Sequence, residues 1–391
     1  MTAGARPVAW IRRAPMFRDR TNAIASVVLG AAIAYAGVGF VRWGIVHAVW
    51  SLPEDAGSET CRAVRGEGAC WAVVAERLRF ILFGTYPFAE QWRPAAACVL
   101  FVALYAASSV RRWCNWRLLA LWTLLPSAAV TLLRGGLPGM PVVPSEFWGG
   151  LPLTFLLSTV GFAAAFPLAI ALALGRRSPL PAVKALCIAY IEVVRGVPLA
   201  TFLFMAAVMF PLFVPEGRTI DKVLRAQAAL VMVIAAYVAE VVRGGLQAVP
   251  RGQYEAAASL GLTYWPSTLL VVLPQALRVS IPALVNTFIA FFKDTSLVTV
   301  IGLFDLLGAA RAVIVDAKWV GFGIEVYLFV AAVYFAFCYG VSRYSQHLER
   351  VLQPDAVIDQ GSAVFNGRGR GDASHRHTGR QQVVRRSARP A

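Results

Sequence analysis

The feature that most limits the fold of this chain is the recurrence of long apolar segments. The segment at about 151–174, for example, contains no Asp, Glu, Lys or Arg. A helix of that length spans the roughly 30 Å hydrocarbon core of a bilayer. Because no water reaches that core, the backbone groups inside it must bond one another, as they do in a helix. We therefore predict an all-α integral membrane protein.

The composition agrees with this prediction. Of the 391 residues, 58% are hydrophobic and 15% are charged, whereas a soluble domain is near half apolar and about a quarter charged. The net charge of +16 could suggest a nucleic-acid partner. However, the basic residues lie in the N-terminal arm, in short loops and in the C-terminal tail, which is typical of membrane orientation and contact with anionic headgroups. We predict a lipid bilayer around the chain and no nucleic acid.

About eight segments are expected to form transmembrane helices. They lie at about 22–42, 95–110, 118–133, 151–174, 185–214, 226–242, 279–303 and 323–342. Basic residues precede the first span and follow the second and the fourth, so the positive-inside rule places these three parts in the cytoplasm. An even number of spans then places both termini in the cytoplasm.

The order of the spans predicts four parts of the chain. Residues 1–20 form a cytoplasmic N-terminal arm, and residues 21–146 form an accessory membrane part with an external loop at 43–94. Residues 147–350 contain the last five spans. Residues 351–391 are rich in Gly, Ser, Arg and His, so we expect a disordered basic cytoplasmic tail.

A moderately polar stretch separates the spans at 226–242 and 279–303. Its informative positions are Glu255, Ala256, Ala257, Gly261, Leu273 and Pro274. The alanines would let a short helix pack closely against another protein, the glycine can end that helix, and the proline fits the first turn of the next one. We predict a folded loop at the cytoplasmic surface.

This stretch resembles the signature loop of ABC importer permeases. The order is Glu-Ala-Ala, three residues, Gly, nine residues, an aliphatic residue, any residue, Leu and Pro, and it is met here without a gap. The Arg-Gly-Val-Pro element at 195–198 and the Lys-Asp-Thr-Ser element at 293–296 are similar to the polar amino acid branch of that family. Residues 68–93 are similar to the general L-amino-acid permeases, which have an extended N-terminal part.

The resemblance covers roughly residues 20–350. It implies that the last five spans form a type I ABC importer permease core. It also implies that the signature loop docks on a separate ATPase and transmits its movement to the spans on either side. In physical terms this is alternating access by the rocking of rigid halves.

Two charged residues lie near the middle of their expected spans. A charge at that depth costs several kcal/mol unless it faces protein or water. We predict that Arg195 and Asp294 face a shared central cavity, with Arg195 opposite the carboxylate of a zwitterionic amino acid and Asp294 opposite its ammonium. Thr295 and Ser296 could add hydroxyl contacts to the substrate pathway, and Lys293 belongs to the same element.

A purely structural role for these charges is the alternative. Arg195 could pair with Glu192 one turn earlier on the same helix, and Lys293 could pair with a neighbour. The sequence alone supports the structural and the substrate-contacting roles about equally for Arg195 and Asp294, and it favours the structural role for Lys293.

No constellation of catalytic or metal-ligating residues is evident. The His residues at 47, 347, 375 and 377 form no pair on one helical face. None of the four lysines follows Gly and precedes Ser or Thr, as the lysine of a phosphate-binding loop does. We predict a transport subunit that is not an enzyme, with no catalytic residue, no metal site and no cofactor, and with ATP hydrolysis by a partner subunit.

Cys61 and Cys70 form a candidate disulfide. They lie in one external loop with eight residues between them, and that loop faces an oxidising compartment if the N-terminus is cytoplasmic.

Together these features favour the permease subunit of an ATP-driven ABC importer for polar L-amino acids in a bacterial inner membrane. The expected partners are two copies of an ATPase, a second homologous permease and a periplasmic amino-acid-binding protein. A secondary, ion-coupled amino acid transporter is the alternative, but that class needs no docking loop and usually shows repeat symmetry. A membrane scaffold without transport would leave the charges at mid-span unexplained.

Overall fold

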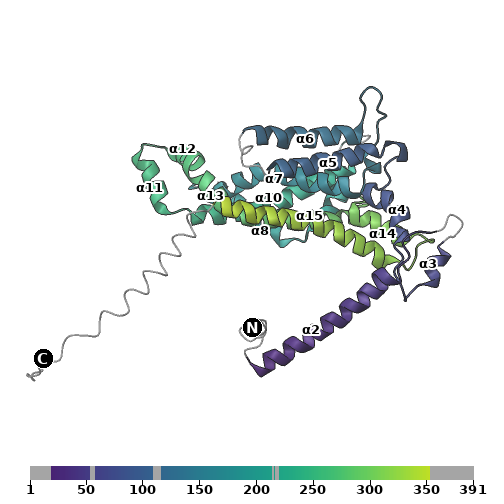
Figure 1. Ribbon diagram of the computed structural model, residues 1–391. Helices are drawn as coiled ribbons and strands as arrows, with labels where there is room; N and C mark the ends of the chain where they lie inside the picture. The colour runs from purple at the N-terminus through teal and green to yellow at the C-terminus, as the bar shows by residue number, and fades with distance from the viewer. Residues whose placement is uncertain (1–18, 53–57, 109–115, 214, 216–219, 353–391) are drawn as a thin grey trace, which may run out of the picture.

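The computed structural model describes residues 19–52, 58–108, 116–213, 215 and 220–352. Within these ranges the chain is helical, with two isolated β-bridges, Val49–Cys70 and Gly150–Asp305. The predicted all-α class is confirmed (Figure 1). Most of the expected N-terminal arm, the basic stretch at 109–115 and the expected tail beyond Leu352 lie outside the described residues.

The N-terminal part of the chain forms a lobe, built by α3 (Glu59–Ala63) and α4 (Ala72–Phe83), and three long helices. Its elements are α2 (Arg20–Val41), η2 (Arg42–Val46), α3 (Glu59–Ala63), α4 (Ala72–Phe83), η3 (Phe88–Glu90), α5 (Trp92–Ser108), α6 (Trp116–Arg134) and η5 (Ser145–Phe147). The remaining elements are α7 (Gly150–Gly175), α8 (Pro181–Gly196), α9 (Leu199–Leu212), α10 (Lys222–Ala248), α11 (Arg251–Ser259), α12 (Tyr264–Pro266), η6 (Ser267–Val272), α13 (Leu273–Asp294), η7 (Thr295–Ile301), α14 (Leu306–Ile314) and α15 (Gly323–Leu352).

Among the described residues, each of the eight expected spans falls mainly on helix. Within the described part of the chain, six helical runs are long and apolar enough to cross a membrane: Arg20–Val46, Trp116–Arg134, Gly150–Gly175, Lys222–Ala248, Tyr264–Ile301 and Gly323–Leu348. The bent pair α8 and α9 makes a seventh if it counts as one span. The remaining expected span coincides with α5, which is 17 residues long.

The span expected at 185–214 is a broken helix rather than a continuous one. α8 and α9 meet at an angle of 102°. Pro198 has no N–H to continue a helical ladder and disfavours the helical conformation of the residue before it. Val197 is accordingly extended, with φ −102° and ψ 133°. The Gly-Val-Pro sequence therefore places two helix ends where a straight span would have an unbroken backbone.

Pro274 lies within the first two positions of α13, as expected, but a helical run precedes it. That run begins at Tyr264, and the stretch Ser267–Val272 is a π-helix. A proline ring clashes with the carbonyl four residues earlier. A π-type stretch is one of the usual ways in which a long helix absorbs such a break.

The core is built around α7 and α10. α10 packs against both α7 and α13, and at the second crossing the backbones come very close. A Cβ added at Gly245 would overlap the Ser280 hydroxyl and the Ala276 carbonyl. The accessory helices join this core through aromatic contacts, such as Phe101 of α5 against Phe155 of α7, whose ring centroids are 5.8 Å apart.

Two parts of the molecule project from the bundle. The lobe with α3 and α4 packs against α14 at one end, while α11 and α12 extend from the opposite end (Figure 1). α2 leads away from the lobe, and none of its residues is buried. The lobe and the α11 region thus mark the two ends of the bundle.

Candidate functional site

An open cavity lies where the broken helix meets the centre of the core. Its volume is about 570 Å³. It is lined by Arg195, Gly196, Val197, Pro198, Leu199, Val233, Tyr237, Asn286, Thr287, Ala290, Phe291 and Asp294. These residues come from the break between α8 and α9, from the middle of α10 and from the C-terminal half of α13. Three elements from separate parts of the sequence therefore line one cavity.

The cavity has one cation and one carboxylate in its lining, and the cation lies against an aromatic ring. The guanidinium carbon of Arg195 lies 5.3 Å from the centroid of the Tyr237 ring. Tyr237 in turn packs edge-on against Phe291, with the centroids 5.5 Å apart. Asp294 is the last residue of α13 and is partly buried. The cavity thus combines a cation on an aromatic face with a carboxylate on the facing helix.

The broken helix adds backbone polarity to the same wall. α8 ends at Gly196 and α9 begins at Leu199, and both residues line the cavity. The last turn of a helix has carbonyl groups without intrahelical partners, and the first turn has such amide groups. The end of α8 therefore carries partial negative charge, and the start of α9 carries partial positive charge.

The other predicted pathway residues lie outside the cavity lining. Thr295 is buried, and its hydroxyl donates to the Phe292 carbonyl at 2.9 Å. The Ser296 carbonyl accepts a bond from the Thr299 hydroxyl at 2.9 Å, and Lys293 is exposed. Arg195 and Asp294 therefore line one cavity, whereas these three residues are not part of its lining.

Tyr237 and Thr287 were not singled out by the sequence analysis. Tyr237 lies on α10, four residues after Val233, so the two share one face of the helix and both line the cavity. Thr287 follows Asn286 in the C-terminal half of α13, and both residues line the cavity. A tyrosine in a long apolar span is only a weak indication of a cavity-lining residue, because aromatic residues are common in membrane helices.

A group of partly exposed charges lies between the cavity and α11. Arg176, just after α7, bonds Glu192 of α8 at 3.1 Å and Glu240 of α10 at 3.1 Å. Glu240 also accepts from the Arg243 Nε at 2.9 Å. Among the described residues, no ion pair joins Arg195 to Glu192, because Glu192 is paired with Arg176. The structural alternative for Arg195, an ion pair with Glu192 on the same helix, is therefore not formed.

The loop with the family signature folds into a short exposed helix. Glu255 and Ala256 of α11 face outward, while Ala257 is buried. Gly261 ends the helix with φ +74°. Its N–H donates to the Ala258 carbonyl at 2.9 Å, and the next N–H, of Leu262, donates to the Ala257 carbonyl at 3.1 Å. This pair of bonds is the Schellman motif, which favours glycine at that position.

The end of the signature joins the loop to the core. Leu273 is buried and Pro274 is exposed. At the next residue, the Gln275 amide donates to the Gln253 side chain at 3.0 Å. That bond links α13 back to α11.

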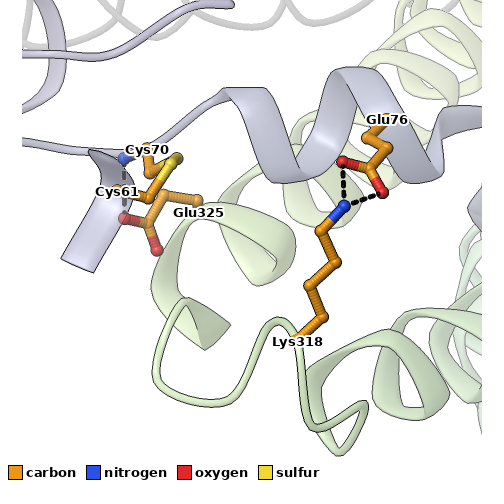
Figure 2. The surroundings of a disulfide bond; sticks show 5 residues. All are labelled: Cys61, Cys70, Glu76, Lys318 and Glu325. Carbon is orange, nitrogen blue, oxygen red and sulfur yellow. Dashed lines mark hydrogen bonds and ion pairs between the residues drawn. A yellow bond between two sulfur atoms is a disulfide. The ribbon is translucent and has the colours of Figure 1, made fainter. Parts of the chain in front are cut away.

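The lobe with α3 and α4 contains a disulfide bond between Cys61 and Cys70 (Figure 2). Their Cα atoms are 5.6 Å apart, and the Cys70 amide donates to the buried Glu325 carboxylate of α15 at 3.0 Å. Nearby, Lys318 bonds Glu76 of α4 at 2.7 Å. The lobe is thus fastened to the loop between α14 and α15, far along the chain.

Comparison with known proteins places this geometry among membrane transport components. Residues 165–353 match the family described as binding-protein-dependent transport system inner membrane component. The chain is 45% identical over 318 residues to the inner membrane amino-acid ABC transporter permease protein YhdY of Escherichia coli (strain K12), an alignment that covers 79% of this chain and 83% of that protein.

A second relative and one solved structure are also similar. The chain is 38% identical over 379 residues to the glutamate/glutamine/aspartate/asparagine transport system permease protein BztC of Rhodobacter capsulatus, which covers 80% of this chain and 86% of that protein. A crystal structure of an amino acid ABC transporter with histidines is 34% identical, with a TM-score of 0.46, and the match covers 51% of this chain and 91% of that chain.

Proposed function

The chain belongs to the amino-acid ABC transporter permeases, and on that premise we propose that it moves polar L-amino acids through the cavity at the α8–α9 break. Members of this family are multi-pass inner membrane subunits and are not enzymes themselves, because ATP hydrolysis belongs to a separate ATPase subunit. Importers of this kind work with that ATPase and with a binding protein. The secondary transporter that the sequence left as an alternative is therefore set aside.

The observation that carries the proposal is that Arg195 and Asp294 line one cavity. An amino acid bears a carboxylate and an ammonium at neutral pH, and both must be compensated in a low-dielectric passage. The planar guanidinium fork of Arg195 suits the carboxylate, and Asp294 suits the ammonium. The amide groups at the start of α9 would support the carboxylate end. Lys293, Thr295 and Ser296 would then support the pathway indirectly, by holding the end of α13.

The coupling element in this proposal is α11 with the residues that follow it. Glu255 and Ala256 are exposed on a helix that projects from the bundle (Figure 1). Small side chains on such a helix let it enter a groove on another subunit. Gly261 fixes where the helix ends, and Leu273 and Pro274 join the loop to α13. A movement of the ATPase would thereby reach the helices that carry the cavity.

We further propose that the subunit works beside a second homologous permease, two ATPase copies and a periplasmic amino-acid-binding protein. α9 exposes large apolar side chains next to the open cavity, among them Phe204, Val208 and Leu212. A second permease would cover that face and close the cavity. With eight spans, both termini and α11 would lie in the cytoplasm, and the disulfide-bonded lobe would face the binding protein.

The proposal is tested by purification from the native membrane in mild detergent. We expect the ATPase to co-purify with the wild-type chain and to be lost from the Glu255→Arg variant, with the membrane abundance of the chain unchanged. Arg311→Glu on α14 is the control, since Arg311 is exposed in a different part of the chain. Retention of the ATPase and full uptake in Glu255→Arg would reject α11 as the docking element.

A further inference from the structure

We propose that Arg176 and Arg177, the two residues that follow α7, are positioning residues that connect α11 to the cavity. The inference rests on the proposed function, since it takes α11 to be the contact with the ATPase. Arg177 contacts α11, and Arg176 contacts the two helices, α8 and α10, that contribute to the cavity. Because consecutive Cα atoms are about 3.8 Å apart, a displacement at one residue is passed directly to the other.

Arg177 forms the end at α11. Its guanidinium donates to the Tyr254 hydroxyl at 3.0 Å and to the Leu246 carbonyl at 3.4 Å. The guanidinium carbon also lies 5.7 Å from the centroid of the Tyr254 ring. Tyr254 is on α11 and Leu246 is in the last turns of α10. Arg177 therefore ties the α7–α8 turn to the coupling helix and to the helix that precedes it.

Arg176 forms the end at the cavity. It bonds Glu192 and Glu240 with separate nitrogens, so one guanidinium bridges α8 and α10. The exposed fraction of the side chain is between 22% and 27% for Arg176, Glu240 and Arg243. Partial burial matters, because charge pairs that are partly shielded from water interact more strongly than fully exposed ones.

The two carboxylates lie one turn from the cavity residues. Glu192 precedes Arg195 by three residues on α8, and Glu240 follows Tyr237 by three residues on α10, so each pair shares a helix face. Glu240 is also close enough to Arg195 to interact with it electrostatically. Arg176 thus compensates the carboxylates that would otherwise compete with a substrate carboxylate for Arg195.

This arrangement predicts different effects for the two arginines. Loss of Arg176 leaves Glu192 and Glu240 less compensated, which draws Arg195 toward them and weakens substrate binding. Loss of Arg177 leaves the cavity charges in place but detaches α11 from the α7–α8 turn. The first change should raise KM, and the second should lower transport per ATP hydrolysed.

The experiment uses the complete transporter, reconstituted in liposomes with its ATPase, its partner permease and its binding protein. Uptake kinetics, ATP hydrolysis and abundance are measured for Arg176→Gln, Arg177→Gln and the control Lys222→Gln, which removes an exposed charge at the other end of α10. We expect KM to rise about tenfold in Arg176→Gln, and uptake per ATP to fall about tenfold in Arg177→Gln, a usual size for coupling between sites. The control should match the wild type.

Two further variants separate positioning from simple loss of stability. Arg176→Lys keeps the charge but cannot span both carboxylates, so we expect an intermediate KM even if the Gln variant is poorly produced. Arg177→Gln combined with Tyr254→Phe should lose less coupling than the sum of the two single losses, because both changes break the Arg177–Tyr254 bond, while Tyr254→Phe also removes the bond from the Tyr254 hydroxyl to the Leu246 carbonyl at 3.3 Å. Fully additive losses would contradict the connection.

The inference and the proposed function fail in different ways. If the Arg176 and Arg177 variants all match Lys222→Gln while Glu255→Arg releases the ATPase, the connection is overturned and the docking assignment stands. If Glu255→Arg keeps its ATPase and full uptake, the docking assignment fails, and the connection fails with it.

Discussion

The guanidinium of Arg195 stands over the ring of Tyr237, with 5.3 Å between the guanidinium carbon and the ring centroid. Such a contact stabilises a cation by about 0.5–2 kcal/mol, depending on how far it is desolvated. The contact is made by the electron-rich face of the ring and not by a carboxylate. The cation is therefore held in place without being neutralised.

The first prediction concerns this cation. Arg195→Lys keeps the charge but loses the planar fork, so we expect KM for amino acid uptake to rise about tenfold or more, corresponding to the loss of one charge-assisted hydrogen bond. Uptake kinetics in vesicles measure this, with ATPase binding and abundance unchanged. Arg311→Lys on α14 is the matched control. A purely structural Arg195 would instead lower abundance and leave KM unaltered.

The second prediction concerns the opposite charge. Asp294→Asn removes the carboxylate that would face the substrate ammonium while keeping the size of the side chain. We expect KM to rise by a similar factor of about ten, since a charge-assisted bond is again lost. The same vesicle assay applies. If Asp294→Asn and Arg195→Lys both show wild-type kinetics, the main substrate site belongs to the partner permease.

The third prediction concerns the end of the coupling helix. In Gly261→Pro, the proline cannot adopt φ +74° and lacks the N–H that donates to the Ala258 carbonyl. The Schellman motif is therefore lost. We expect uptake to be abolished with membrane abundance retained, because a surface loop contributes little to insertion. Gly252→Ala, at an open position on the same helix, should transport normally. Normal uptake in the proline variant would contradict a coupling role.

The fourth prediction concerns the crossing of α10 and α13. Gly245→Ala introduces a Cβ that overlaps the Ser280 hydroxyl and the Ala276 carbonyl, whereas a Cβ at the adjacent Gly244 meets nothing within 4 Å. We expect Gly245→Ala to cost about 1–3 kcal/mol, as overpacking does, and Gly244→Ala to be neutral. Thermal unfolding in detergent compares the two. Equal melting temperatures would show that the helices can separate without penalty.

The fifth prediction concerns the external disulfide. The chain has six cysteines, and the two in the bond leave four (6 − 2) to react with a maleimide mass tag after denaturation without reductant. Reduction before tagging should raise this number to six. In Cys61→Ala the partner Cys70 becomes free, so five should react with or without reductant. Six tagged cysteines in the unreduced wild type would exclude the bond.

The sequence predicted the membrane spans because their signals are local, since an apolar run indicates its environment directly. The break at Gly-Val-Pro, residues 196–198, also has a local cause in the proline, but 185–214 was expected as one span. Arg195 and Asp294 could be linked because each charge was too costly to leave in lipid. No such signal distinguished Thr295 and Ser296, since successive helical residues point in different directions and the chain tightens to a 3-10 helix after Asp294.

The partners of the charged side chains could not be predicted in the same way. Glu192 was weighed as a partner for Arg195, three residues away, yet it bonds Arg176 across the turn after α7. The Cys70 amide reaches Glu325, 255 residues later in the chain. Contacts of this kind depend on how whole helices pack, which a single sequence does not specify through spacing or composition.

The break between α8 and α9 also affects how such a protein can diverge. Part of the polarity of the cavity comes from helix ends, and therefore from main-chain groups that are the same whatever side chain a residue carries. Substitutions at Val233 or Ala290 would then change the size of the cavity for a larger or smaller amino acid. The main-chain groups that compensate the charges of the amino acid would stay in place. We expect changes of substrate among related permeases to map to these apolar lining positions, while the helix break at Pro198 is retained.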